Sequence, residues 1–275
     1  MPPPIRYVKN GEVSIAYQVS GDGPHDVLVV PGWVSHLALD WEEPYWVRWH
    51  DRMGRFARLI RFDKRGTGLS DRPPGIPTLE ERMKDARAVL DALDLERVHL
   101  LGRSEGGPLS VLLAVAHPER VLNVVLYGTQ ACFKTKPDYP WGREAAEQQT
   151  EIDDFAEIWG SAALGKYFAP DADDRFLDRW ANYSRAAASP SAAAAELDVR
   201  VRAGVHFGEV LERDGALRGI AVHFAARVMA KAAGGEVLVS ETVKDIVAGS
   251  GLTFEDRGLH ELKGIDGARR LFAVP

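Results

Sequence analysis

The stretch VHLLGRSEGG, residues 98–107, decides the fold class of this chain. Apolar residues open it, the pattern Gly-x-Ser-x-Gly closes it around Ser104, and an apolar helical pattern follows. A serine in so tight a turn needs neighbours without side chains two positions away, which Gly102 and Gly106 supply. The turn lifts the hydroxyl above a sheet, where the Glu105 amide points at a developing oxyanion. The stretch therefore predicts a strand, a nucleophile turn and a helix.

Short apolar runs alternate with helical patterns on both sides of this stretch. Four runs rich in β-branched residues indicate parallel strands that are covered on both faces, at 26–30, 58–62, 98–101 and 121–126. Helical patterns lie between them, at 41–57, 79–93 and 109–116. The run 13–19 after an Asn-Gly turn predicts an antiparallel hairpin at one edge. Residues 1–130 thus predict an α/β fold with a doubly wound, mostly parallel sheet.

The pattern changes twice after residue 130. Residues 131–196 contain no convincing strand and predict a cap-like region of three or four helices. Near its end, Ser189 and Pro190 indicate either a short helix or a linker. From residue 197 to 275 strands and helices alternate again, with Ser240 as a predicted helix cap. This part holds 11 acidic and 11 basic residues, so the rest of the chain carries the net charge of −6. We therefore expect a boundary near residue 197.

The composition excludes several classes of protein. With 275 residues, 45% hydrophobic and 27% charged, the chain is typical of a soluble globular protein. Its net charge of −6 offers no basic surface to nucleic acid or to an anionic membrane. One cysteine, Cys132, excludes an intrachain disulfide and a multi-cysteine zinc site, and favours a cytoplasmic location. We expect no cofactor and no metal ion, and no apolar stretch is long enough to span a bilayer.

Two segments upstream of the nucleophile turn agree with it. The segment VVPGW, residues 29–33, follows an early strand, where the second oxyanion amide of such a fold is expected, here that of Trp33. The segment FDKRGTGLSD, residues 62–71, follows the next strand. Its glycines suit a bent loop beside the turn, and we interpret its charges as structural pairs rather than as catalysts.

These segments together resemble a known family. Residues 5–130 resemble an α/β-hydrolase, specifically the hydrolase domain found fused to class III adenylate/guanylate cyclases. The segments that carry the resemblance are PGWVSH (31–36), FDKRGTGLSDR (62–72), GRSEGGP (102–108) and HPERV (117–121). Residues 131–196, with PDYPWG at 137–142, resemble the cap of that family. The resemblance implies an acid and a histidine after Ser104, yet the pattern changes where they are expected.

The C-terminal segment resembles the second half of a class III cyclase catalytic domain. The motifs are RAGVHFGEV (202–210), GIAVHFAARVMAKAAGGEVLVS (219–240) and FEDRGLHELKGI (254–265). Arg227 occupies the position of the transition-state arginine of that family. His223 replaces the expected asparagine, and Ala216 stands at the position of the adenine-selecting aspartate. The half with the two metal-binding aspartates is missing, so the resemblance implies that cyclase activity is lost.

A serine nucleophile also needs a base. We predict that His260 serves Ser104 and that Glu241 orients His260. The C-terminal strands and helix, ending in the loop 257–260, repeat the order in which a hydrolase presents its acid and histidine. The tail would then extend the main sheet beside 121–126, or reach the serine across a homodimer.

Two functions remain open at this point. The first is a serine carboxylic-ester hydrolase that acts on a small-molecule ester with a small or medium acyl group. The second is a non-catalytic sensor or interaction module, which keeps the hydrolase pocket and uses the cyclase remnant for self-association. His36 beside the oxyanion segment and His206 at the end of an apolar strand are alternative bases. The two functions differ in whether Ser104 reacts as a nucleophile.

Overall fold

The computed structural model describes residues 2–130, 135, 140–197, 203–209, 211–213, 216–233, 236–249 and 251–274. Cys132, residues 137–139 of the cap-like segment, and Arg202 and Val210 of the motif 202–210 lie outside these described residues. The chain divides into two compact units, Met1–Thr135 with Trp141–Val199, and Lys136–Pro140 with Arg200–Pro275. Each unit is described by itself.

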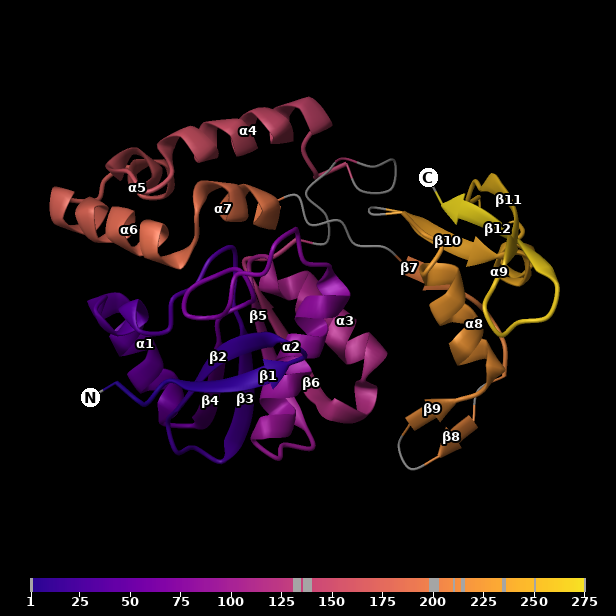
Figure 1. Ribbon diagram of the computed structural model, residues 1–275, viewed down its shortest axis with the longest axis horizontal. Helices are drawn as coiled ribbons and strands as arrows, with labels where there is room; N and C mark the ends of the chain where they lie inside the picture. Colours follow the sequence, from indigo (N-terminus) through magenta and orange to yellow (C-terminus); the bar gives the residue numbers. More distant parts are fainter. Residues whose placement is uncertain are drawn as a thin grey trace. The chain divides into compact units, whose positions relative to one another are not determined.

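The first unit is built on a six-stranded sheet in the order β1-β2-β4-β3-β5-β6 (Figure 1). Its strands are β1 (Arg6–Asn10), β2 (Val13–Ser20), β3 (His25–Val30), β4 (Ala57–Phe62), β5 (Val98–Arg103) and β6 (Val121–Tyr127). Strands β4, β3, β5 and β6 are parallel to one another. Strands β1 and β2 form an antiparallel hairpin at one edge. The predicted doubly wound, mostly parallel sheet and its edge hairpin are confirmed.

Helices cover both faces of this sheet over β3, β4 and β5, whereas β6 is largely exposed, so the expectation that 121–126 is covered on both faces is wrong. The helices are α1 (Pro44–Gly54), α2 (Leu79–Ala92) and α3 (Gly106–Ala116), with short 3-10 turns η1 (Leu39–Trp41) and η2 (Pro118–Arg120). Leu28 and Val30 lie in the core formed with α2 and α3. Val27 and Val29 belong to the other core, against which Trp49 of α1 packs. Alternate residues of β3 therefore face opposite layers, which explains its unbroken apolar run.

Four helices follow the sheet in the first unit and lie together beyond the end of β5 (Figure 1). They are α4 (Ala145–Ile158), α5 (Ala162–Phe168), α6 (Asp174–Ala187) and α7 (Pro190–Leu197). The Ala192 N–H donates to Ser189 Oγ at 3.3 Å, so Ser189 caps α7 and Pro190 is its first residue. Of the two alternatives predicted for this segment, the short helix is correct and the linker is wrong. The Gly68 N–H donates to the Ala187 carbonyl at 2.7 Å and ties α6 to the loop after β4.

The second unit has sheets of its own. Its elements are β7 (Ala203–Val205), β8 (Leu211–Arg213), β9 (Ala216–Arg218), α8 (Ile220–Met229), β10 (Val237–Ser240), α9 (Glu241–Ile246), β11 (Glu255–Glu261) and β12 (Ala268–Val274). One sheet has the order β11-β12-β10-β7, and β8 pairs with β9. Ser240 Oγ accepts the Val243 N–H at 3.4 Å, so the predicted cap of α9 is confirmed.

Two expectations about the tail are wrong. The loop expected at 257–260 lies inside β11, where a bulge around Gly258, with a φ of 79°, interrupts the pairing with β12. The main sheet ends at β6, which pairs only with β5 in the described ranges, so the tail does not extend that sheet. The described strands of the second unit form sheets of their own. None of the helices among the described residues has the length and apolarity needed to span a membrane.

Candidate active site

Ser104 occupies a strained turn between β5 and α3. Its φ is 49°, in the left-handed region that residues with a side chain rarely adopt. The Ser104 N–H donates to the Tyr127 carbonyl at 3.0 Å, and the Ser104 carbonyl accepts the Gly107 N–H at 3.0 Å. The predicted strand, tight turn and helix are confirmed. Strain of this kind is typical of functional sites and of a nucleophile turn in particular.

Gly102 and Gly106 of the motif have no room for a side chain. A Cβ on Gly102 would lie 2.5 Å from Ser110 Oγ. A Cβ on Gly106 would lie 2.3 Å from the Val30 carbonyl oxygen. Both distances are far below van der Waals contact, so any side chain at either position would push α3 away from the sheet. The glycines therefore hold the start of α3 close to the ends of β3 and β5.

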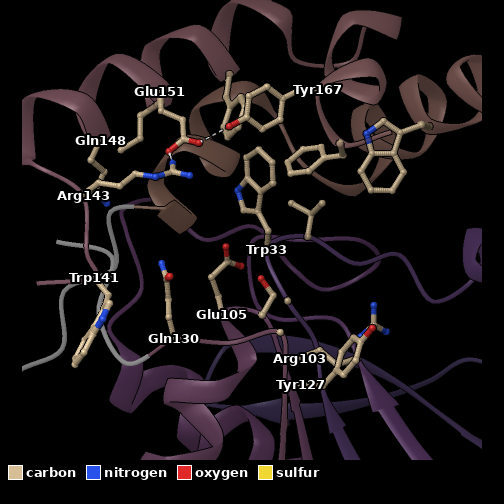
Figure 2. A pocket seen from close by; sticks show the side chains of 18 residues that line it. Trp33, Arg103, Glu105, Tyr127, Gln130, Trp141, Arg143, Gln148, Glu151 and Tyr167 are labelled. Carbon is tan, nitrogen blue, oxygen red and sulfur yellow. Dashed lines mark hydrogen bonds and ion pairs between the residues drawn. The ribbon is translucent and has the colours of Figure 1, made fainter. Parts of the chain in front are cut away.

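Ser104 opens into a cavity of about 670 Å³ between the sheet and the helices α4–α6 (Figure 2). Aromatic side chains form much of its wall, namely Trp33, Tyr127, Trp141, Phe155, Tyr167, Phe168 and Trp180. Figure 2 shows Arg143, Gln148 and Glu151 above Trp33 and Glu105. Glu151 forms an ion pair with Arg143 and accepts the Tyr167 hydroxyl at 2.9 Å. The cavity thus combines an apolar wall with a polar cluster opposite the serine.

Trp33 joins the segment after β3 to the helices above it. Its indole Nε1 donates to the Ala193 carbonyl at 2.7 Å, and its ring lies 5.1 Å from Phe155 and 5.1 Å from Trp159, centroid to centroid. The Trp33 carbonyl accepts Lys64 Nζ at 3.2 Å. A methyl group on the preceding Gly32 would touch the side chain of Ser104. The Trp33 backbone is therefore fixed beside the serine.

A partly buried polar network connects the sheet with α6. Tyr183 of α6 donates its hydroxyl to Asp40 Oδ1 at 3.0 Å and accepts the His36 N–H at 3.1 Å. Arg61 pairs with Asp40 at 2.8 Å. Burial raises the pKa of Asp40, and Arg61 opposes this effect. Sequence reasoning missed Asp40 and Tyr183, because they lie on different elements and no local motif joins them.

The residue before the nucleophile is held by aromatic rings. The Arg103 guanidinium lies 4.0 Å from the ring centroid of Trp46 and 5.8 Å from that of Trp49. Burial lowers the pKa of Arg103, and the negative charge of Asp40 opposes this effect. The cation–π contacts hold this side chain against α1.

The loop after β4 has a structural role, as predicted. Asp63 is fully buried and accepts the Ser35 hydroxyl at 2.7 Å and the Leu69 N–H at 2.9 Å. Burial raises the pKa of Asp63 to about 6, and these hydrogen bonds oppose the effect. Arg65 pairs with the buried Asp85 at 2.6 Å. These charges brace the loop and do not face the cavity around Ser104.

No histidine is among the described residues that line this cavity. His36 Nδ1 accepts the Leu39 N–H at 3.3 Å, and burial lowers the pKa of His36. His50 is buried beside Trp41, and burial lowers its pKa to about 3. His99 lies five residues before Ser104 on β5, at the other end of the strand, where Nδ1 meets the side chain of Asn123 at 3.1 Å.

The second unit holds the other candidates for the base and its acid. His206 Nδ1 meets Ser240 Oγ at 2.8 Å. His260 Nε2 lies 2.9 Å from the Arg257 carbonyl. Glu241 is exposed at the start of α9, and no hydrogen bond or ion pair joins it to His260 in the described part of the chain. His260 instead contributes to lowering the pKa of Glu236, behind the larger effects of the Ala233 N–H and Arg257. The assignment of His260 and Glu241 stays a prediction.

The sheet, the strained serine and the overlying helices define an α/β-hydrolase type of fold. The family model described as alpha/beta hydrolase fold matches residues 27–209, more than half of the chain. The chain therefore belongs to the α/β-hydrolase fold family. The resemblance of residues 202–275 to class III cyclases stays a prediction.

Several characterised proteins are similar to this chain. A pimeloyl-[acyl-carrier protein] methyl ester esterase of Nitrosomonas europaea is 30% identical over 131 residues, 48% of this chain and 47% of the esterase. A 2-hydroxy-6-oxo-2,4-heptadienoate hydrolase of Pseudomonas putida is 40% identical over 87 residues, 30% of this chain and 32% of the hydrolase. The chain thus matches half or less of the length of these relatives.

A solved structure agrees with the fold. The esterase EaEST of Exiguobacterium antarcticum superposes with a TM-score of 0.56 at 23% identity, over 70% of this chain and 73% of the esterase. At this level of identity the superposition establishes the fold alone.

Proposed function

We propose that this protein is a serine carboxylic-ester hydrolase with Ser104 as its nucleophile. The observation that carries the proposal is the φ of 49° at Ser104, in a turn between strand and helix that opens into a cavity. A side chain is held in this conformation only where the surrounding structure enforces it. Membership of the α/β-hydrolase fold family and similarity to an esterase support the same reaction.

The proposed reaction uses two backbone donors. Ser104 Oγ attacks the acyl carbon and passes its proton to a base, and the alcohol leaves with that proton. The amides of Trp33 and Glu105 would stabilise the oxyanion, since one residue lies beside Ser104 and the other follows it at the start of α3. Water then hydrolyses the acyl-enzyme. The aromatic wall suits an apolar acyl group of small or medium size.

The base is the least constrained part of the proposal. We assign it to His260, with Glu241 as its acidic partner, and keep His36 and His206 as alternatives. Single alanine variants of the three histidines separate these assignments. Loss of the true base leaves the oxyanion hole and binding alone, so the rate falls by about 10²–10³ or more. The two other alanine variants are expected to keep most of the activity.

A non-catalytic binding module is the second candidate. It is favoured by one observation, the lack of a histidine among the described residues that line the cavity. Under this alternative, the cavity binds an ester or acid without cleaving it, and the C-terminal unit mediates self-association as a homodimer. We further propose that the C-terminal unit does not cyclise ATP or GTP.

Hydrolysis of p-nitrophenyl esters tests the proposed function. The wild-type protein is expected to cleave short-chain esters, and Ser104→Ala is expected to lower the rate by about 10³ or more. A Ser110→Ala variant is the matched control, because Ser110 is fully buried on α3 and its hydroxyl donates to the Gly106 carbonyl at 2.7 Å, its one hydrogen bond to the described residues. Equal rates for wild type and Ser104→Ala would reject Ser104 as the nucleophile. No measurable hydrolysis by either protein, with tight binding of an ester analogue, would favour the binding module.

A further inference from the structure

A second cavity of about 290 Å³ lies in the first unit, between the start of α1 and the helix α6. Tyr45 and Trp46 line it from α1, and Phe176, Trp180 and Tyr183 line it from α6. Its volume suits a ligand of a few heavy atoms rather than a long acyl chain. The reaction proposed above does not use this cavity.

The aromatic residues of α6 form one continuous surface. Phe176, Trp180 and Tyr183 are four and three residues apart, so they share one face of the helix. Their rings are stacked in a row, with centroids 6.3 Å apart for Phe176 and Trp180 and 5.8 Å for Trp180 and Tyr183. The rings of Tyr45 and Trp46 lie 5.3 Å apart on the opposite side. The cavity is therefore enclosed by aromatic rings from two helices.

The charged side chains that line the cavity include more carboxylates than cations. Glu42, Glu43 and Arg179 line it. Arg179 pairs with Glu43 at 2.9 Å, so these two charges offset each other. The carboxylate of Glu42 is exposed and makes neither an ion pair nor a hydrogen bond within the described ranges. Among the charged side chains that line the cavity, Glu42 is thus the one without an opposite partner in the described residues, while Arg103 holds a positive charge against Trp46, 4.0 Å from its ring centroid.

The aromatic rings and the Glu42 carboxylate together favour one chemical class of ligand. Aromatic rings attract cations through the negative potential of their faces. An unpaired carboxylate favours the same charge and opposes an anion. A quaternary ammonium group has apolar methyl groups, so it is desolvated at less cost than a primary ammonium group.

We propose that this cavity is a binding site for a small organic cation with a quaternary ammonium group. Glu42 supplies the charge, and the rings of α1 and α6 supply the enclosing surface. Trp180 lines both this cavity and the one that contains Ser104. A cation bound here therefore contacts a wall that the two cavities share. The proposal does not depend on whether Ser104 is a nucleophile.

Calorimetric titration of the full chain tests the site, with choline and 3,3-dimethyl-1-butanol as the probes. The alcohol has the shape of choline with carbon in place of the charged nitrogen, so the pair isolates the effect of charge. Choline is expected to bind at least about tenfold more tightly than the alcohol. Glu42→Gln is expected to weaken choline binding about fivefold and to leave binding of the alcohol unchanged.

Two further variants complete the experiment. Tyr45→Leu removes a half-exposed ring and is expected to weaken choline binding about threefold or more. Glu12→Gln, in the turn between β1 and β2, is the matched control and is expected to bind choline like the wild type. Glu42 and Tyr45 are both exposed, so neither substitution threatens folding. Equal affinity for the two probes, no choline binding, or an unchanged affinity in Glu42→Gln would each overturn the proposal.

Discussion

A methyl group on Gly32 would lie 3.0 Å from Ser104 Cβ and 3.7 Å from Ser104 Oγ. The backbone that leads into Trp33 is therefore in contact with the serine, although Gly32 follows β3 and Ser104 follows β5. Gly32, Trp33 and Ser104 all line the same cavity.

Gly32→Ala is expected to lower kcat for ester hydrolysis about 10–100-fold, because the added methyl group displaces the serine or the amide. Steady-state kinetics with a p-nitrophenyl ester measure the effect. Gly54→Ala, at the end of α1 beside Gly21, is the control and is expected to keep the wild-type rate. A wild-type kcat in Gly32→Ala would show that this contact does not shape the site.

Tyr183→Phe is expected to destabilise the protein by about 1–3 kcal/mol, since the partly buried Asp40 carboxylate and the His36 N–H both lose a hydrogen-bond partner. Urea denaturation measures the free energy of unfolding. Tyr167→Phe is the matched control, because its exposed hydroxyl bonds to Glu151 near the surface and is expected to change stability by less than about 0.5 kcal/mol. Equal losses in the two variants would contradict the role of Tyr183.

Asp63 gives the stability a defined dependence on pH. Burial raises its pKa from 3.8 to about 6, so the folded protein binds this proton more tightly than the unfolded chain. The contribution of Asp63 to the free energy of unfolding is fully present below about pH 4. It is lost as the pH rises through about 6, a change of about 3 kcal/mol. Asp63→Asn removes the titration. The stability of the wild type minus that of Asp63→Asn should therefore be larger at about pH 4.5 than at about pH 7.

Urea unfolding of both proteins at the two pH values measures this difference, and the other titrating groups cancel in the subtraction. A difference that does not change with pH would show that Asp63 titrates normally. A difference that grows with pH would show that folding lowers the pKa of Asp63 instead of raising it.

Phe155→Ala is expected to shift the substrate preference toward longer acyl chains. Phe155 is buried in the wall of the cavity beside Trp33, so its removal enlarges the space next to Ser104. The ratio of kcat/KM for an octanoate ester to that for a butyrate ester should rise about tenfold. An unchanged ratio would indicate that the acyl group does not lie against Phe155.

The fold of the first 130 residues could be predicted because its signals are local. Each parallel strand contains a short, mostly apolar run, and the helices between them have apolar residues at helical spacing. The nucleophile turn could be found for the same reason, since Gly102 and Gly106 lie within two residues of Ser104. These features need no knowledge of distant contacts.

The remaining features depend on contacts between distant residues. Asp40 and Tyr183 are 143 residues apart, and only the folded chain brings them together. In the tail, the sequence around Gly258 predicts a loop, whereas a bulge allows β11 to continue past this glycine. Most of β11 is exposed, so it lacks the apolar run that identified the strands of the main sheet. Pairing with β12 makes this segment a strand, although its own sequence does not indicate one.

The central claim is that Ser104 is a reactive nucleophile. Incubation of the full chain with a fluorophosphonate, followed by peptide mass mapping, tests it most directly, because the reagent labels activated serines covalently. Among all serines of the chain, we expect stoichiometric labelling at Ser104, and no labelling in Ser104→Ala. An unlabelled Ser104 in the folded wild-type protein, or equal labelling of wild type and Ser104→Ala, would contradict the claim.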